Sequence, residues 1–375
     1  EQGKLEEAIE AYNKAIAIKP DYAEAYNNMG NALAVQGKLE EAIEACNKAL
    51  ALKPDYADAY SNMGNTLARQ GKPEEAIAAY NKALAIKPEC AELSHNMSFT
   101  LLNSGRLKEG LEKYECRWKT IQNLDKRRQF SKPMWDGKTS LKGKRILIWC
   151  EQGVGDTINW CSYLPLIASQ AGHCILECQK KLVPLIARSF PNIEVKTANS
   201  SLDSSRDDFD FHLPMGSLYG QFIPEVSKNP RTDAFLVPDP VRVNFWRNRL
   251  NSLGSGPYVG ISWKSSNISP SRIQNYASIS KLAPVITLPD ITFINLQYRG
   301  FKDDLTKIKS ELGVTVHNFD DLDHFENLED VAALTAAMDI IVTTHNVLVM
   351  IASGVGAATK FASWKQSPWS NVLLS

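Results

Sequence analysis

The sequence lacks a net charge, a cysteine framework and long apolar runs. Its 375 residues carry 42 Lys and Arg against 42 Asp and Glu, so charge gives no reason to expect nucleic acid or an acidic lipid surface as a partner. The seven cysteines are an odd number without a C-x-x-C pair, which argues against disulfides or a zinc site and favours a reducing cytoplasm. No apolar run approaches the ~20 residues of a membrane-spanning helix. We therefore expect a cytoplasmic protein without a membrane span, a bound metal or a cofactor.

Residues 1–119 contain an internal repeat of 34 residues. The recurring residues are a glycine, a proline and an alanine, with Gly110 in the fourth alanine position: Gly3, Gly37, Gly71 and Gly105; Pro20, Pro54 and Pro88; Ala8, Ala42 and Ala76. This period is typical of tetratricopeptide repeats. Each unit would be two antiparallel helices, with a glycine of positive φ in the turn and a proline after the second helix. Stacked units form a superhelix with a concave binding surface. Because the first unit lacks its leading helix, we expect the array to be truncated at its start.

Three asparagines recur at one place on the first helix of successive units: Asn28, Asn62 and Asn96. Stacking would carry them along one surface as a ladder of amides. They could hydrogen-bond helix to helix, or they could hold the main chain of a protein or peptide in the concave groove. The second interpretation resembles the asparagine ladder of the eukaryotic O-GlcNAc transferase, whose repeats also precede a glycosyltransferase domain.

The helical period fades at Thr120, and we expect residues 120–142 to form a linker. Short apolar runs then alternate with helical stretches, starting with "RILIWC" and restarting with "YVGISW", which predicts parallel sheets. The expected fold class is therefore α plus α/β: a tetratricopeptide superhelix followed by two Rossmann-like lobes. Their ligand cleft would lie at the carboxyl ends of the strands. The expected lobes are residues 143–254 and residues 255–375, the latter incomplete.

From Tyr114 to Ser375 the chain resembles bacterial proteins whose C-terminal domain is related to ADP-heptose heptosyltransferases. The motifs that carry the resemblance are "YECRW", "PMWDG", "ILIWCEQGVGDTI", "VGISWKS", "INLQY", "DVAALTAAMDIIVTT" and "SPW". The resemblance implies a GT-B glycosyltransferase that inverts configuration without a metal and takes its sugar from a nucleotide-sugar. The family's late loop usually has an acid–threonine pair and, four residues beyond the threonine, a histidine. Here those positions read His345, Asn346 and Met350.

Such a transfer needs a base for the acceptor's proton. Asp156 ends the loop "EQGVGD", where heptosyltransferases place an acidic residue, so it is the first choice. It would equally suit the N-cap of a helix starting near Thr157. Glu151 is the second choice. Gly153 and Gly155 would let backbone N–H groups approach the sugar or phosphate.

The leaving diphosphate needs positive charge or dipoles. After the strand "YVGISW" we expect these from Lys264, Ser265, Ser266 and Arg272, unless this segment is only a flexible polar loop. A helix beginning near Asn346, preceded by Thr344 and His345, would supply N–H groups and a positive dipole end. His345 could instead be a surface loop residue.

Gln297 and Tyr298 end the strand "ITFINLQY". They are placed to touch the base or ribose of a nucleotide, or else they form a solvent-facing strand end.

Three functions fit this sequence. The first is a glycosyltransferase whose protein or glycan acceptor is recruited by the repeats. The second is a protein-binding scaffold with a degenerate transferase domain, which the changes at His345, Asn346 and Met350 favour. The third is a nucleotide-binding enzyme of another class, because a fold alone does not determine chemistry.

Overall fold

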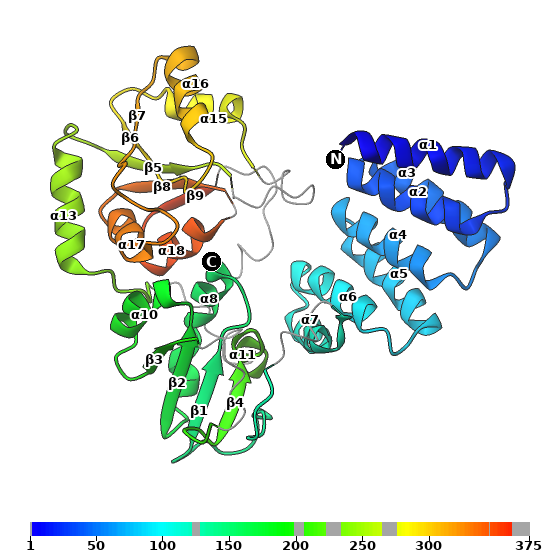
Figure 1. Ribbon diagram of the computed structural model, residues 1–375, viewed down its shortest axis with the longest axis horizontal. Helices are drawn as coiled ribbons and strands as arrows, with labels where there is room; N and C mark the ends of the chain where they lie inside the picture. The colour runs from blue at the N-terminus through cyan, green and yellow to red at the C-terminus, as the bar shows by residue number, and fades with distance from the viewer. Residues whose placement is uncertain are drawn as a thin grey trace. The chain divides into compact units, whose positions relative to one another are not determined.

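The computed structural model describes residues 2–121, 128–198, 206–222, 234–264, 276–344 and 346–361. Its contacts divide the described chain into two units, one ending at Ile121 and one starting at Arg128 (Figure 1). None of the helices in these described ranges is both long and apolar enough to cross a membrane.

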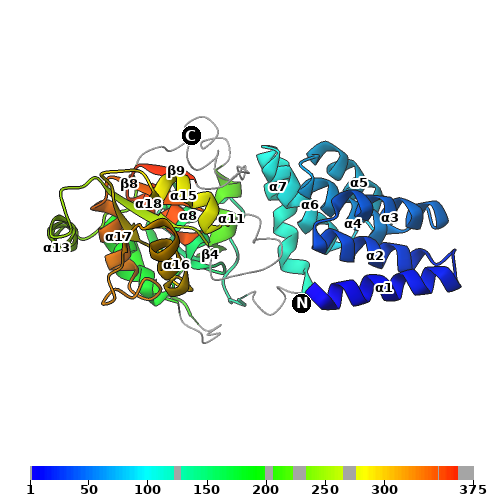
Figure 2. The same ribbon diagram turned by 90° about the horizontal axis from the view of Figure 1, so that it is seen from above.

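The first unit is a stack of antiparallel helices (Figure 2). Helix α2 pairs with α3, α4 with α5, and α6 with α7, which confirms the two-helix repeat. The helices are α1 (Gln2–Ile18), α2 (Ala23–Gln36), α3 (Leu39–Leu52), α4 (Ala57–Arg69), α5 (Pro73–Ile86), α6 (Ala91–Asn103) and α7 (Leu107–Tyr114), followed by the 3-10 helix η1 (Glu115–Lys119).

Glycines of the repeat have two different functions. In the turns, Gly37, Gly71 and Gly105 have φ values of 88°, 80° and 81°, the left-handed conformation that glycine adopts without strain. Gly64 instead lies within α4, where a Cβ would be 3.0 Å from the ring of Tyr80 in α5. The missing side chain therefore allows the two helices of this unit to approach closely.

This close approach gives the first prediction. Tyr80 is buried and its hydroxyl donates to Asn65 Oδ1 at 2.7 Å, so its ring has little freedom to move. We expect Gly64→Ala to lower the free energy of unfolding by about 1–3 kcal/mol through overpacking. The measurement is urea denaturation of the whole chain. Gly3→Ala is the matched control, because no atom lies within 4 Å of a Cβ there. It should be neutral or stabilising by up to about 1 kcal/mol, and equal effects of the two changes would contradict this account.

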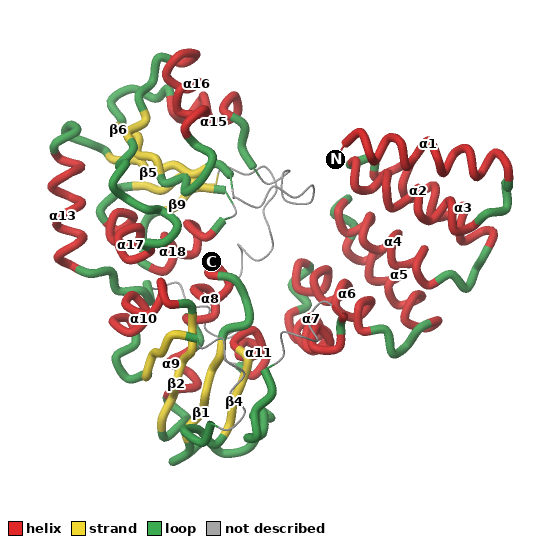
Figure 3. The backbone as a smooth tube through the Cα atoms, viewed as in Figure 1, coloured by secondary structure: helices red, strands yellow, loops and turns green. Residues whose placement is uncertain are grey.

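The second unit contains two separate parallel sheets, drawn in yellow in Figure 3. The first has the order β3-β2-β1-β4 and the second β7-β6-β5-β8-β9, with all pairs parallel. Parallel sheets were expected, and they are confirmed. The strands are β1 (Arg145–Trp149), β2 (His173–Cys178), β3 (Glu194–Thr197), β4 (Phe211–Pro214), β5 (Tyr258–Ser262), β6 (Thr292–Asn295), β7 (Val316–His317), β8 (Ile340–Thr343) and β9 (Thr359–Phe361).

Each sheet and the helices packed on it form a lobe. The first lobe contains α8 (Val154–Cys161), α9 (Leu164–Ala168), the 3-10 helix η3 (Lys180–Leu182), α10 (Val183–Ser189) and α11 (Met215–Gln221). The second contains α13 (Pro240–Asn251), α15 (Ile279–Ile286), α16 (Lys302–Leu312), α17 (Leu328–Ala336) and α18 (Val347–Gly354).

Helix α13 lies within the range 143–254 expected for the first lobe, yet it packs against α17 of the second. Trp246 of α13 is buried and donates to Asp330 at 3.0 Å. Arg242 binds the same carboxylate through two hydrogen bonds of 2.5 and 2.6 Å. The second lobe therefore begins with α13.

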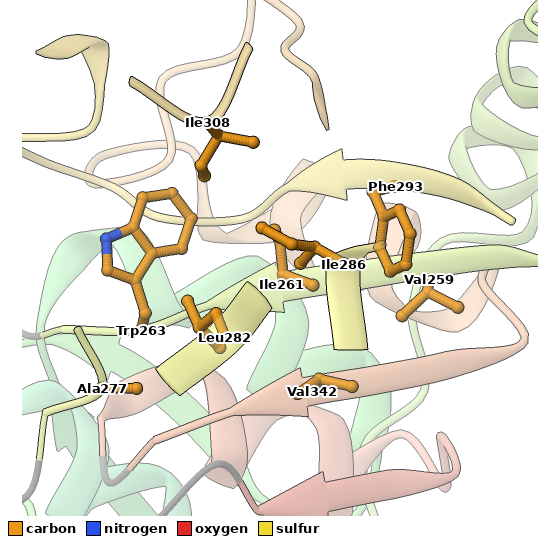
Figure 4. Close-up of a cluster of buried hydrophobic side chains, with 9 residues drawn as sticks. All are labelled: Val259, Ile261, Trp263, Ala277, Leu282, Ile286, Phe293, Ile308 and Val342. Atoms are coloured by element: carbon orange, nitrogen blue, oxygen red, sulfur yellow. The ribbon is translucent and has the colours of Figure 1, made fainter. Parts of the chain in front are cut away.

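The second lobe has an apolar core between its sheet and the helices α15 and α16 (Figure 4). The cluster consists of Val259, Ile261, Trp263, Ala277, Leu282, Ile286, Phe293, Ile308 and Val342. Burying each large apolar side chain contributes about 1.5–3 kcal/mol. This core fixes the position of the sheet. It therefore also fixes the places at which the strands end.

Candidate functional site

The two lobes meet where central strands of both sheets end. Helix α8 follows β1, helix α18 follows β8, and these two helices pack against each other (Figures 1 and 2). A Cβ on Gly155 would lie 3.8 Å from Cα of Val347. A helix N-terminus has N–H groups without partners inside the helix and carries positive partial charge. The start of α8 thus lies beside the start of α18 at strand ends, where parallel α/β proteins bind ligands.

Asp156 lies in the first turn of α8 and is exposed. The helix begins at Val154, earlier than the expected start near Thr157, and its N-cap is Gly153. The N-cap interpretation of Asp156 is therefore wrong. Its Oδ2 would be 3.5 Å from a Cβ on Gly153, so the carboxylate lies near the helix start, where negative charge is favourable.

Glu151, the second choice of base, has a structural partner in the first lobe. Its Oε1 accepts a hydrogen bond of 3.0 Å from the backbone N–H of Gly216, at the start of α11. Glu151 is half-buried. This contact joins the loop after β1 to the helix after β4, so Glu151 has a positioning role.

A hydrogen-bonded chain of polar side chains, two of them buried and Asn346 half-buried, joins three strand ends of the second lobe. Gln297 is fully buried, and its Oε1 accepts from Ser262 Oγ at 3.1 Å and from the backbone N–H groups of Trp263 and Lys264 at 3.1 and 3.0 Å. Asn346 Nδ2 donates to Ser262 Oγ at 2.8 Å. We call Gln297, Ser262 and Asn346 the strand-end chain.

The strand-end chain corrects the expectation for Gln297, whereas the helix expected to begin near Asn346 does begin there, at Val347. Gln297 was expected to touch a base or ribose, but a fully buried side chain with these partners shapes the loop after β5 instead. Asn346 caps α18, because its Oδ1 accepts from Leu348 N–H at 2.9 Å. A phosphate at this helix would therefore be bound through backbone N–H groups rather than through the Asn346 amide.

Lys264 and Thr344 lie close to the strand-end chain. Lys264 Nζ is 2.5 Å from Asp304 Oδ2, and the same oxygen accepts from Trp263 Nε1 at 2.7 Å. The Lys264 charge is thus already paired. Thr344 is fully buried, and its hydroxyl has no hydrogen-bond partner within the described ranges.

Four of the expected donor-binding residues lie outside the described residues: Ser265, Ser266, Arg272 and His345. Tyr298 is described and half-buried. Its ring stacks on Phe325, with centroids 6.1 Å apart and an interplanar angle of 26°. In the parts of the chain that the structure describes, no three His, Cys, Asp or Glu side chains are grouped as a metal site requires.

Two buried ionisable residues were not anticipated. Glu177 in β2 is 2% exposed and forms ion pairs with Arg128 and Arg206. The available signal was a single acid inside the apolar strand "CILEC". His324 is 7% exposed, and burial lowers its pKa to about 4. Its acidic flanking sequence "DDLDHFENLED" predicts a solvated loop, so the burial of His324 was not expected.

In the repeats, the three expected asparagines differ in environment. Asn28 is exposed, whereas Asn62 and Asn96 are half-buried. Asn62 Nδ2 donates at 2.8 Å to Oδ1 of Asn27, a buried residue of the preceding unit. Helix-to-helix hydrogen bonding, one of the two interpretations, therefore applies to Asn62. The exposed Asn31 and Asn65 form a second row, each three positions after an asparagine of the ladder.

This inter-repeat bond gives the second prediction. Asn62→Ala removes the donor from the buried Asn27 oxygen, and an unsatisfied buried acceptor costs about 1–3 kcal/mol. We expect a loss of this size in the free energy of unfolding, measured with urea. Asn31→Ala, the matched control at an exposed position of α2, should stay within about 0.5 kcal/mol of the parent. A loss as large for Asn31→Ala as for Asn62→Ala would show that the Asn27 contact is not responsible.

Comparisons with known proteins identify the first unit. Two family models, described as tetratricopeptide repeat and TPR repeat, match residues 21–89 and 1–37. The first unit is therefore an array of tetratricopeptide repeats. Protein FlbA of Caulobacter vibrioides is 32% identical over an alignment of 271 residues that covers 68% of this chain and 45% of FlbA. The chain thus spans less than half the length of this curated relative.

Solved structures of similar proteins match about a third of the chain. MamA is 28% identical over 33% of this chain and 72% of its own, with a TM-score of 0.30. A thermophilic TPR protein of Thermus thermophilus is 26% identical over 33% and 69%, with a TM-score of 0.30. YrrB, described as a TPR protein with an unusual peptide-binding site, is 25% identical over 32% and 62%, with a TM-score of 0.28.

Proposed function

We propose that this chain is a cytoplasmic glycosyltransferase of GT-B type. Its second unit would bind a nucleotide-sugar, and its repeats would recruit a protein or glycan acceptor. The observation that carries the proposal is the meeting of α8 and α18, whose N-termini lie side by side at the strand ends of two parallel sheets. The resemblance to heptosyltransferases supports the choice of a sugar donor over other nucleotides.

The start of α18 is the proposed site of the donor diphosphate. It follows the inner strand β8, and the strand-end chain holds it against the central strand β5. Backbone N–H groups and the helix dipole suit a diphosphate. They would also stabilise the negative charge that develops on the leaving group as the bond to the sugar breaks.

Asp156 is the proposed base. It is exposed on α8, the helix that faces α18. Its carboxylate would take the proton of an acceptor hydroxyl while the hydroxyl oxygen bonds to the anomeric carbon and the nucleoside diphosphate leaves from the opposite side. This in-line displacement inverts the configuration at the sugar.

The repeats are the proposed acceptor site. Three amides of the repeats are exposed: Asn28 of the ladder, and Asn31 and Asn65 of the second row. Uncharged amides can donate to and accept from the main chain of an extended peptide whatever its side chains. YrrB, which is similar to the repeats, is described by its peptide-binding site.

A protein-binding scaffold without catalysis is the second candidate. The observation that favours it is that two side chains expected to bind the donor are bonded to other groups of the protein instead. Lys264 is paired with Asp304, and the amide of Asn346 caps its own helix. The replacements at His345, Asn346 and Met350 in the late loop also favour the scaffold.

The third prediction separates these candidates. The intact chain is first screened by thermal shift against UDP-, GDP-, ADP- and CMP-sugars, because a ligand at 100 times its Kd stabilises the native state by about 2.7 kcal/mol. With the donor that shifts the melting temperature, Asp156→Asn should lower turnover by about 10²–10⁴. Its affinity for the donor should not change.

Asp239→Asn is the matched control. Asp239 is a true N-cap, since its Oδ1 accepts from Val241 N–H at 2.8 Å at the start of α13. The same substitution there should leave turnover intact. Normal turnover in Asp156→Asn would exclude Asp156 as the base. If no donor raises the melting temperature of the chain and no sugar is transferred, the scaffold function remains.

A further inference from the structure

Arg299, in the loop after β6, is an exposed arginine whose side chain is held in place without a polar partner. Its guanidinium lies over the ring of Phe325, 4.2 Å from the ring centroid, and its carbonyl oxygen accepts from Gln297 Nε2 at 3.3 Å. Within the described ranges the guanidinium forms no hydrogen bond and no ion pair. Its five N–H donors, which share one plane, are therefore available to a ligand.

The acidic residues beside Phe325 are engaged with other groups. Asp323 Oδ1 accepts from the backbone N–H groups of Phe325 and Glu326 at 2.8 and 2.9 Å. Glu326 Oε1 lies 3.6 Å from Nζ of Lys181 in the first lobe. Lys181 also lies on the Phe325 ring, 3.7 Å from its centroid, so this ring carries two cations. The charge of Arg299 thus has no counter-ion in the described chain, which favours a ligand group rich in hydrogen-bond acceptors.

The geometry of a guanidinium limits which groups can be bound. A guanidinium that stacks on a ring can still donate in its own plane, and its fork fits two acceptors that lie side by side. Carboxylates and phosphates have such a pair, and so does guanine, with O6 and N7. Adenine instead places an amino donor beside N7, and cytosine also presents an amino donor. Among the bases, guanine is therefore the best partner.

The position of Arg299 separates it from the proposed diphosphate site. In the order β7-β6-β5-β8-β9, β6 is two strands and β7 three strands from β8. Neighbouring strands are about 4.8 Å apart, so the loops that carry Arg299 and Phe325 are roughly 10–14 Å from the start of α18. The same phosphate groups cannot occupy both places. The base of a nucleotide whose diphosphate lies at α18 reaches this far along the strand ends.

We propose that Arg299 reads the base of the donor nucleotide, donating two N–H groups to O6 and N7 of guanine while its plane rests on Phe325. This inference rests on the proposed function, because it needs a diphosphate at α18. It names the donor class, a GDP-sugar. Phe325 is a positioning residue for the guanidinium. An anion site that binds phosphate alone is the competing explanation, and the following experiment distinguishes the two.

The test compares Arg299→Lys with the parent chain by calorimetric titration with GDP, ADP, UDP, CDP and inorganic pyrophosphate. We expect the parent to bind GDP most tightly. The variant should bind GDP about 10- to 100-fold more weakly, because a bidentate contact to guanine supplies discrimination of this size and an ammonium cannot form the fork. Its affinities for pyrophosphate and for the other nucleotides should stay the same. Lysine keeps the charge and can remain over the Phe325 ring, so the melting temperature should also be unchanged.

Two further variants complete the design. Arg247→Lys makes the same change at an exposed arginine of α13 and should leave every affinity unchanged. Arg299→Ala removes the charge as well as the fork. It should lose the preference for GDP as fully as Arg299→Lys and keep the affinity for pyrophosphate.

Several results would overturn the inference. An unchanged affinity for GDP in Arg299→Lys would exclude base recognition by the fork. An equal loss for GDP and pyrophosphate in Arg299→Ala would identify an anion site instead. A parent that prefers another base, or binds all four nucleotides equally, would overturn the inference and sustain the proposed function. A parent that binds neither nucleotides nor pyrophosphate would contradict the proposed function itself.

Discussion

A hydrogen-bonded chain at the carboxyl ends of β6, β5 and β8 determines what the second lobe can present to a ligand. Gln297 is buried and its Oε1 holds the loop after β5, while Asn346 bonds to Ser262 and starts α18. In the interior each of these bonds is costly to lose, because a buried donor without a partner costs about 1–3 kcal/mol. The chain therefore keeps the N-terminus of α18 beside the central strands. The proposed diphosphate site depends on this position.

The first lobe meets this helix start through α8 and is joined to the second lobe at a further place. Arg188 of α10 pairs with Glu329 of α17, and Lys181 donates to the carbonyl oxygen of Phe325 at 2.8 Å. These contacts connect the loop after β7 and helix α17 to the first lobe. Contacts at two places therefore hold Asp156 of α8 near the start of α18.

The sequence predicted the elements well because their signals are periodic. The 34-residue recurrence predicted the helical repeats, and the alternation of apolar runs with helical stretches predicted the parallel sheets. The role of Gln297 could not be predicted, because a polar residue at a strand end looks the same whether it faces a ligand or a buried partner. His324 was missed for the opposite reason, since its acidic neighbours suggest solvent and only tertiary packing buries it. Asp156 lies inside α8 rather than at its cap, because Gly153 is the N-cap and the helix begins at Val154.

The central claim is that α8 and α18 together form a site for the diphosphate of a nucleotide-sugar. The most direct measurement is a crystal structure of the whole chain soaked with the nucleoside diphosphate that stabilises it most. The account predicts phosphate oxygens within about 2.7–3.2 Å of backbone N–H groups in the first turn of α18, on the side that faces Gly153 and Gly155. A nucleotide bound elsewhere, or no bound nucleotide at saturating concentration, would contradict the account.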